Sequence, residues 1–166
     1  MIKYIKNILA ALVVTAGLFS CEQERLDPVL TTAQGGGTLN EYMAYTIAST
    51  DPSGSNVYGR IVFWKDNLER TLVQVSLYNT VPGLKHPALI IEGMVGSGTT
   101  TLVELDDVSG DSGELDANKF FIIADTDFYS SIPEMDAHIN IYLSDTDDTI
   151  VATGDLGANA DPVESN

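Results

Sequence analysis

Cysteine is nearly absent from this sequence, with a single copy, Cys21, among 166 residues. One cysteine cannot form a disulfide within the chain, so the stability of the fold must come from an apolar core. Basic residues are also scarce, since 8 Lys and Arg stand against 24 Asp and Glu, for a formal net charge of -16. Because binding to nucleic acid or anionic lipid depends on Lys and Arg displacing counterions, this balance argues against a polyanionic partner.

Histidine occurs only twice, as His86 and His138. A metal site shared by the two is disfavoured, because coordination usually needs three or four protein ligands and no cysteine is free to help. His86 precedes Pro87 at the entry to a predicted strand, where a solvent-facing loop histidine is the simplest interpretation. His138 lies in phase with Asn140 and Tyr142, so it can hydrogen-bond across a sheet.

Long apolar runs are absent except at the N-terminus, where Lys3 and Lys6 precede the apolar stretch Ile8–Phe19. This stretch is too short to cross a hydrocarbon core of about 30 Å comfortably. It ends at Leu18-Phe19-Ser20-Cys21, which fits a bacterial lipobox. The sequence therefore predicts a lipoprotein signal peptide over residues 1–20 and a lipid attachment point at Cys21. Cleavage would remove two lysines and no carboxylate, leaving a net charge of about −18.

Residues 21–40 show little hydrophobic periodicity and contain Gly35-Gly36-Gly37, so we expect a flexible tether. Glu22-Gln23-Glu24, directly after the cysteine, resembles the surface-export signal of bacterial surface lipoproteins. This resemblance implies an outer-membrane lipoprotein that faces outward. Contact with the membrane is expected through the lipid alone.

From Tyr42 onward the sequence changes to short runs rich in Val, Ile, Thr, Tyr and Phe, separated by Gly, Pro, Asn and Asp, as is typical of strands. The predicted strands are Tyr42–Ala48, Val57–Trp64, Arg70–Tyr78, Pro87–Glu92, Thr100–Leu105, Lys119–Ile123, Ala137–Ser144 and Thr149–Thr153. The fold class that follows is all-β, an antiparallel sandwich or barrel of about eight short strands in one domain over residues 41–159. A short helical turn is expected over Phe128–Met135, with Asp127 as its cap and Pro133 limiting its length. The end of the chain from Ala158, including residues 160–166, is expected to be a disordered tail.

Two of these runs also indicate how far their strands are buried. Val73, Val75 and Leu77 alternate with polar residues, which indicates a half-exposed strand. The run Ala88-Leu89-Ile90-Ile91 is apolar on both faces, which indicates a covered strand inside the sheet.

Other motifs carry weaker chemical signals. Gly96-Ser97-Gly98 lies between two predicted strands and lacks the lysine and helix of a phosphate loop, so a hairpin turn is expected there. Three carboxylate clusters, Asp106-Asp107, Asp125-Thr126-Asp127 and Asp145-Thr146-Asp147-Asp148, could supply oxygen ligands for calcium. None matches an EF-hand loop, and solvated turns are the preferred interpretation.

Three segments carry a resemblance to a known family. They are Asp51-Pro52 with Val57–Phe63, then His86–Gly93 followed by Gly96–Gly98 and Val103–Leu105, and finally Ile139–Ser144 with Ala152–Gly157. In this order and spacing they resemble the CHRD domain family, which is named for repeats in chordin and also occurs in bacterial secreted and lipid-anchored proteins. The resemblance covers most of the chain after Cys21.

The departures from this family concern its histidines. The resemblance places the second and third histidines of the family's His-Pro-Ala-His-Ile-His hairpin at Leu89 and Ile91, and the histidine of a later strand at Tyr142. Only His86 matches. In a family member two histidines at positions i and i+2 of a strand would share one face and suggest a metal site. Here we expect Leu89, Ile91 and Tyr142 to form an apolar, metal-free cluster on one face, with no cofactor.

Two functions follow from the sequence. The first is a membrane-anchored, non-catalytic CHRD-like lipoprotein of the cell envelope, a binding or structural module that engages a protein or glycan partner. The alternative is a metal-dependent domain, either a relic of a transition-metal site or a fold stabilised by calcium. Metal content and the effect of a chelator on melting separate the two.

Overall fold

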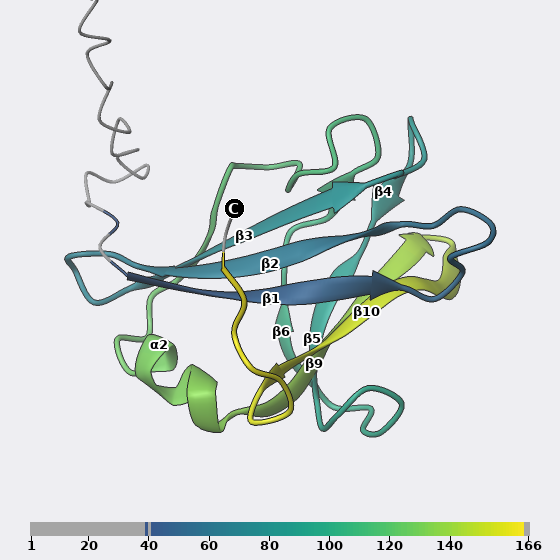
Figure 1. Ribbon diagram of the computed structural model, residues 1–166. Helices are drawn as coiled ribbons and strands as arrows, with labels where there is room; N and C mark the ends of the chain where they lie inside the picture. The colour runs from purple at the N-terminus through teal and green to yellow at the C-terminus, as the bar shows by residue number, and fades with distance from the viewer. Residues whose placement is uncertain (1–38, 40, 165–166) are drawn as a thin grey trace, which may run out of the picture.

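The computed structural model describes residues 39 and 41–164 (Figure 1). The expected signal peptide over residues 1–20, the lipidation site Cys21 and nearly all of the expected tether lie outside the described residues. Within the described part of the chain, no helix is long and apolar enough to cross a membrane.

Ten strands and two short helices make up the part of the chain that the structure describes. In chain order they are β1 (Glu41–Ser49), β2 (Tyr58–Lys65), β3 (Thr71–Tyr78), β4 (Lys85–His86), β5 (Ala88–Glu92), β6 (Thr101–Glu104), β7 (Val108–Ser109), β8 (Phe121–Ile123), α2 (Phe128–Ser131), the 3-10 turn η1 (Ile132–Glu134), β9 (Asp136–Ser144) and β10 (Asp147–Gly157). The all-β prediction is confirmed, and each of the eight predicted strands overlaps an observed one. The two-residue strands β4 and β7, which pair with each other, were not predicted because they are too short to show a period.

Eight strands form one antiparallel sheet in the order β6-β5-β9-β10-β1-β2-β3-β8. The sheet curls into a half-barrel, so that β1, β2 and β3 lie across β5, β6, β9 and β10 (Figure 1). The two halves are joined where the end of β1 pairs with β10, at Ala48 opposite Thr153 and Ser49 opposite Ala152.

Side chains alternate between the concave face of this half-barrel, where the core lies, and the outer face. On β3, Val73, Val75 and Leu77 enter the core, as predicted. The alternating residues Gln74 and Ser76 are half-buried, and Tyr78 is exposed. On β5, Ala88 and Ile90 enter the core, whereas Leu89 and Ile91 point outward. The strand lies inside the sheet between β6 and β9, which confirms the expectation of a covered strand.

The expected helical turn over Phe128–Met135 is confirmed as α2 followed by η1, which carries Pro133 at its start. This pair lies beside one end of the half-barrel (Figure 1), with Ile132 fully buried. Asp127 is the N-cap residue of α2, as expected, but its side chain makes no capping hydrogen bond.

The expected hairpin turn at Gly96-Ser97-Gly98 is confirmed between the antiparallel strands β5 and β6. Ser97 donates its backbone N–H to the Met94 carbonyl at 2.9 Å. Gly98 has a φ of +79°, and a Cβ there would stand 1.8 Å from the Glu92 carbonyl oxygen. The turn therefore needs glycine at this position for both reasons.

The C-terminal segment differs from the expected disordered tail. Val163 donates its backbone N–H to the Ala44 carbonyl at 2.8 Å, and the two residues form an antiparallel bridge. In Figure 1 this yellow segment crosses in front of β1. The sequence did not indicate this contact because it depends on backbone groups that β1 leaves free where it diverges from β10.

Candidate binding site on the outer face of β5, β9 and β10

Leu89 and Ile91 lie on one face of β5, as the resemblance implied. The pairing between β5 and β9 is regular, with Leu89 opposite Asn140 and Ile91 opposite His138. Tyr142 is two residues beyond Asn140 on β9 and so shares this outer face.

All three side chains therefore share the expected face, but the register does not space them evenly. Tyr142 lies diagonally next to Leu89, but Ile91 is at the other end of the row, opposite His138. Asn140 stands between the two ends and is itself buried. The outer face is therefore divided into a half-buried end at Leu89 and Tyr142 and a buried end at Ile91 and His138.

The buried end is held by a chain of hydrogen bonds across three strands. His138 Nδ1 lies 2.7 Å from the Gly93 carbonyl oxygen and must donate to it, which leaves Nε2 to accept from Asn140 Nδ2 at 3.3 Å. Asn140 Oδ1 in turn accepts from Thr153 Oγ1 at 2.7 Å. The prediction that His138 hydrogen-bonds across the sheet is confirmed.

The expectation that His86 is a solvent-facing loop residue is wrong. His86 lies in β4 and has no exposed surface. Its Nδ1 lies 3.0 Å from the Tyr142 carbonyl oxygen, and its Nε2 accepts the backbone N–H of Val81 at 3.4 Å. The imidazole therefore joins the loop before β4 to the strand that carries Tyr142. The sequence did not indicate this role, because His-Pro at the start of a strand is equally typical of an exposed turn.

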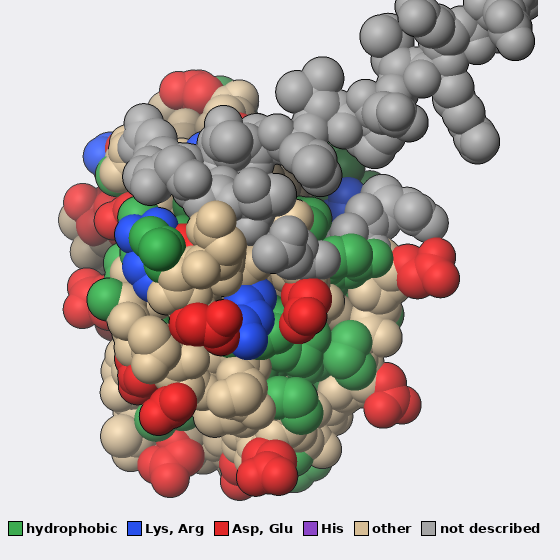
Figure 2. All heavy atoms as spheres, turned by 90° about the vertical axis from the view of Figure 1, so that its left-hand side faces the viewer, with side chains coloured by type: hydrophobic (Ala, Val, Ile, Leu, Met, Phe, Trp, Pro, Cys, Tyr) green, Lys and Arg blue, Asp and Glu red, His purple; other side chains and the backbone are tan. Residues whose placement is uncertain are grey.

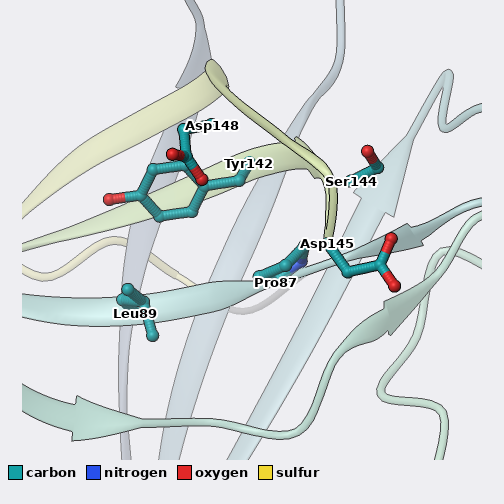
Figure 3. Close-up of a pocket in the computed structure, with 6 residues that line it drawn as sticks. All are labelled: Pro87, Leu89, Tyr142, Ser144, Asp145 and Asp148. Atoms are coloured by element: carbon teal, nitrogen blue, oxygen red, sulfur yellow. The ribbon is translucent and has the colours of Figure 1, made fainter.

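The half-buried end opens into a hollow of about 360 Å³ (Figure 3). It is lined by Pro87, Leu89, Tyr142, Ser144, Asp145 and Asp148. Figure 3 shows the Asp148 carboxylate beside the Tyr142 ring and the Asp145 carboxylate on the other side of Pro87. The family resemblance identified Leu89 and Tyr142, and the sequence showed Asp145 and Asp148 as part of an acidic cluster. It did not indicate that the β9–β10 turn brings these aspartates next to Leu89 and Tyr142.

The floor of the hollow is fixed by backbone contacts. Tyr142 donates its N–H to the Pro87 carbonyl at 3.0 Å, while its own carbonyl accepts from His86. Ser144 Oγ is within 3.2 Å of Thr146 Oγ1, so the hydroxyl is already engaged in the turn. These contacts make the hollow a preformed surface, as most binding sites for small groups are.

The charge of the hollow is negative. Asp145 and Asp148 are exposed, and in the described part of the chain no donor hydrogen-bonds to either carboxylate. The neighbouring Asp147 faces the turn instead, where hydrogen bonds from Thr149 lower the pKa of its carboxyl. Lys85 is bonded to Asp116 at 2.6 Å, and that contact is the main reason that the pKa of Lys85 is raised.

Acidic side chains also cover much of the remaining surface. Figure 2, which looks onto the left-hand side of Figure 1, shows them spread over that face with only a few basic side chains among them. Asp125 Oδ1 accepts the Asp127 N–H at 3.0 Å, the contact of a solvated turn. Among residues 39 and 41–164, no group of three or more His, Cys, Asp and Glu side chains is arranged to hold a metal ion.

The hollow offers an aromatic ring, an aliphatic wall and two carboxylates, whereas both histidines are buried elsewhere in hydrogen bonds. No family model matches this chain, and no curated protein matches it either.

Proposed function

We propose that the protein is a membrane-anchored, non-catalytic lipoprotein of the bacterial cell envelope whose CHRD-like β domain binds a partner at the hollow beside Tyr142. The anchor rests on the lipobox that ends at Cys21. The CHRD assignment rests on the three sequence segments described above.

One observation carries the binding role. Both histidines are engaged through both ring nitrogens in buried hydrogen bonds, while Tyr142 and Leu89 line an open, preformed hollow. A histidine held in this way is not available as a general base or a metal ligand. The accessible chemistry of this face is therefore recognition.

The alternative function, a metal-dependent domain, has less support. Calcium takes six to eight oxygen ligands. The hollow provides two carboxylates and a hydroxyl that already belongs to the turn.

The anchor is tested by labelling cells with palmitate and expressing the wild-type chain beside Cys21→Ser. We expect label and envelope fractionation for the wild type, and an unlabelled, uncleaved precursor for the variant, because processing requires the thioether. Label in the serine variant would refute the lipoprotein assignment.

The binding role is tested by chemical cross-linking in intact envelopes, comparing wild type with Tyr142→Ala. The matched control is Tyr78→Ala, which removes a tyrosine that is 56% exposed on the opposite half of the sheet. We expect a cross-linked product that is lost only in Tyr142→Ala. Equal products from all three chains would place any partner elsewhere.

A further inference from the structure

We infer that the hollow binds the side chain of a lysine or arginine presented by a partner polypeptide. The inference rests on the proposed function, because it names the group that the binding module recognises. It is carried by the shape of the hollow, its wall chemistry and its negative charge.

The wall of the hollow suits the aliphatic stem of such a side chain. Leu89 and Pro87 lie on one side and the Tyr142 ring on another, so methylene groups entering the hollow contact apolar surface. Long basic side chains bury their stems against such surface while the charged head remains hydrated. A volume of about 360 Å³ accommodates one side chain and excludes a folded element.

The rim suits the charged head. Asp145 and Asp148 both line the hollow, and no lysine or arginine lines it with them. A cation beside the Asp148 carboxylate and the face of Tyr142 gains a charge-assisted hydrogen bond and a cation–π contact, and Asp145, beyond Pro87, adds negative charge to the rim (Figure 3). Lys85 is bonded to Asp116 and also interacts electrostatically with Asp145, so Asp148 is the carboxylate of the hollow without a cation near it among the described residues.

The site is also rigid before anything binds. The strand that carries Tyr142 is held by two consecutive residues, since Pro87 accepts the Tyr142 N–H and the buried ring of His86 contacts the Tyr142 carbonyl. Binding therefore orders few protein groups, which lowers its entropic cost. A partner polypeptide is favoured over a free amine because the hollow is open to solvent, leaving room for the chain that bears the side chain.

The test uses the full-length protein in detergent and the capped peptide Gly-Ser-Lys-Ser-Gly, with the same peptide N-acetylated at the lysine side chain as the neutral comparison. Amide chemical shifts are followed by NMR during titration. We expect saturable shifts at residues 88–89 and 142–148 with the lysine peptide, and at least tenfold weaker binding of the acetylated one. Butylammonium alone should bind more weakly than the peptide.

Charge-matched variants separate this site from the general negative charge of the protein. The double change Asp145→Asn with Asp148→Asn should weaken lysine-peptide binding at least tenfold. Asp125→Asn with Asp127→Asn, which removes the same charge elsewhere, should leave it within twofold. Tyr142→Leu, which keeps an apolar wall, should weaken binding severalfold through loss of the ring.

Several outcomes would overturn the inference. Equal weakening in both double variants would show general electrostatic attraction, and equal binding of the acetylated peptide would show an apolar site. Shifts in the same residues with a neutral oligosaccharide or calcium chloride, but not with the lysine peptide, would assign the hollow to that ligand. If the lysine peptide does not bind while Tyr142→Ala still abolishes envelope cross-linking, only this inference is refuted. If the peptide does not bind and Tyr142→Ala leaves the cross-linking unchanged, the proposed function is refuted as well.

Discussion

Replacing His86 with alanine tests the interior contact that supports the candidate site. In the folded protein the imidazole has no exposed surface and bridges two backbone groups, the Tyr142 carbonyl at 3.0 Å and the Val81 N–H at 3.4 Å. Alanine retains neither contact and fills only part of the space.

The expected loss in the free energy of unfolding follows from these contacts. Leaving a buried donor or acceptor unpaired costs about 1–3 kcal/mol, and the long contact to Val81 belongs at the lower end of that range. The cavity left by the ring adds a further cost. Together we expect about 3–5 kcal/mol, a large share of the roughly 5–15 kcal/mol that stabilises a typical domain.

Urea unfolding followed by the fluorescence of Trp64 measures this loss as a lower midpoint at an unchanged slope. The matched control is Lys85→Ala, which changes the neighbouring exposed residue and should cost less than about 1 kcal/mol. A loss below about 1 kcal/mol for His86→Ala would contradict the buried position of the ring and return His86 to the solvent-facing loop that the sequence suggested.

Three further predictions concern stability. Burial raises the pKa of Asp66, but hydrogen bonds from Arg70 and Leu68 outweigh it and leave the pKa below its usual value. The stability that this pair contributes is therefore full above about pH 4 and falls as the pH drops through the folded-state pKa. Asp66→Asn should cost about 1–3 kcal/mol at pH 7 and flatten the acid limb of the stability profile, and an unchanged limb would contradict the pairing. Leu89→Ala should lower the free energy of unfolding by less than about 2 kcal/mol, because this side chain is only half-buried, whereas Ile90→Ala in the core should lower it by about 2–5 kcal/mol. Equal losses of unfolding free energy in a denaturant series would contradict the assignment of faces on β5. Deleting residues 22–38 should leave the melting temperature nearly unchanged. A loss of more than about 2 kcal/mol in the free energy of unfolding would mean that the segment packs on the domain.

The sequence predicted the architecture well because its strands are defined by period-two patterns. Val73, Val75 and Leu77 identified the buried face of β3, and the doubly apolar run at Ala88 identified an inner strand. Such patterns are local, so they are visible without knowledge of the partner strands.

The sequence was less informative where a residue's environment depends on distant contacts. His86 is buried because β9 passes over it, and Val163 is held because β1 leaves the Ala44 carbonyl free. The hollow forms only when the β9–β10 turn brings Asp145 and Asp148 next to Leu89, which is more than 50 residues earlier in the chain. No local pattern records these long-range contacts, so the site could be predicted only in part.

The most direct test of the account is the metal content of the full-length protein purified from its native envelope, measured together with its melting temperature before and after addition of a chelator. A binding module whose two histidines serve the fold should carry no stoichiometric calcium or transition metal, and its melting temperature should not change with chelator. One bound metal per chain, or a melting temperature that falls on chelation and returns when the metal is restored, would contradict the account and favour a metal-dependent domain.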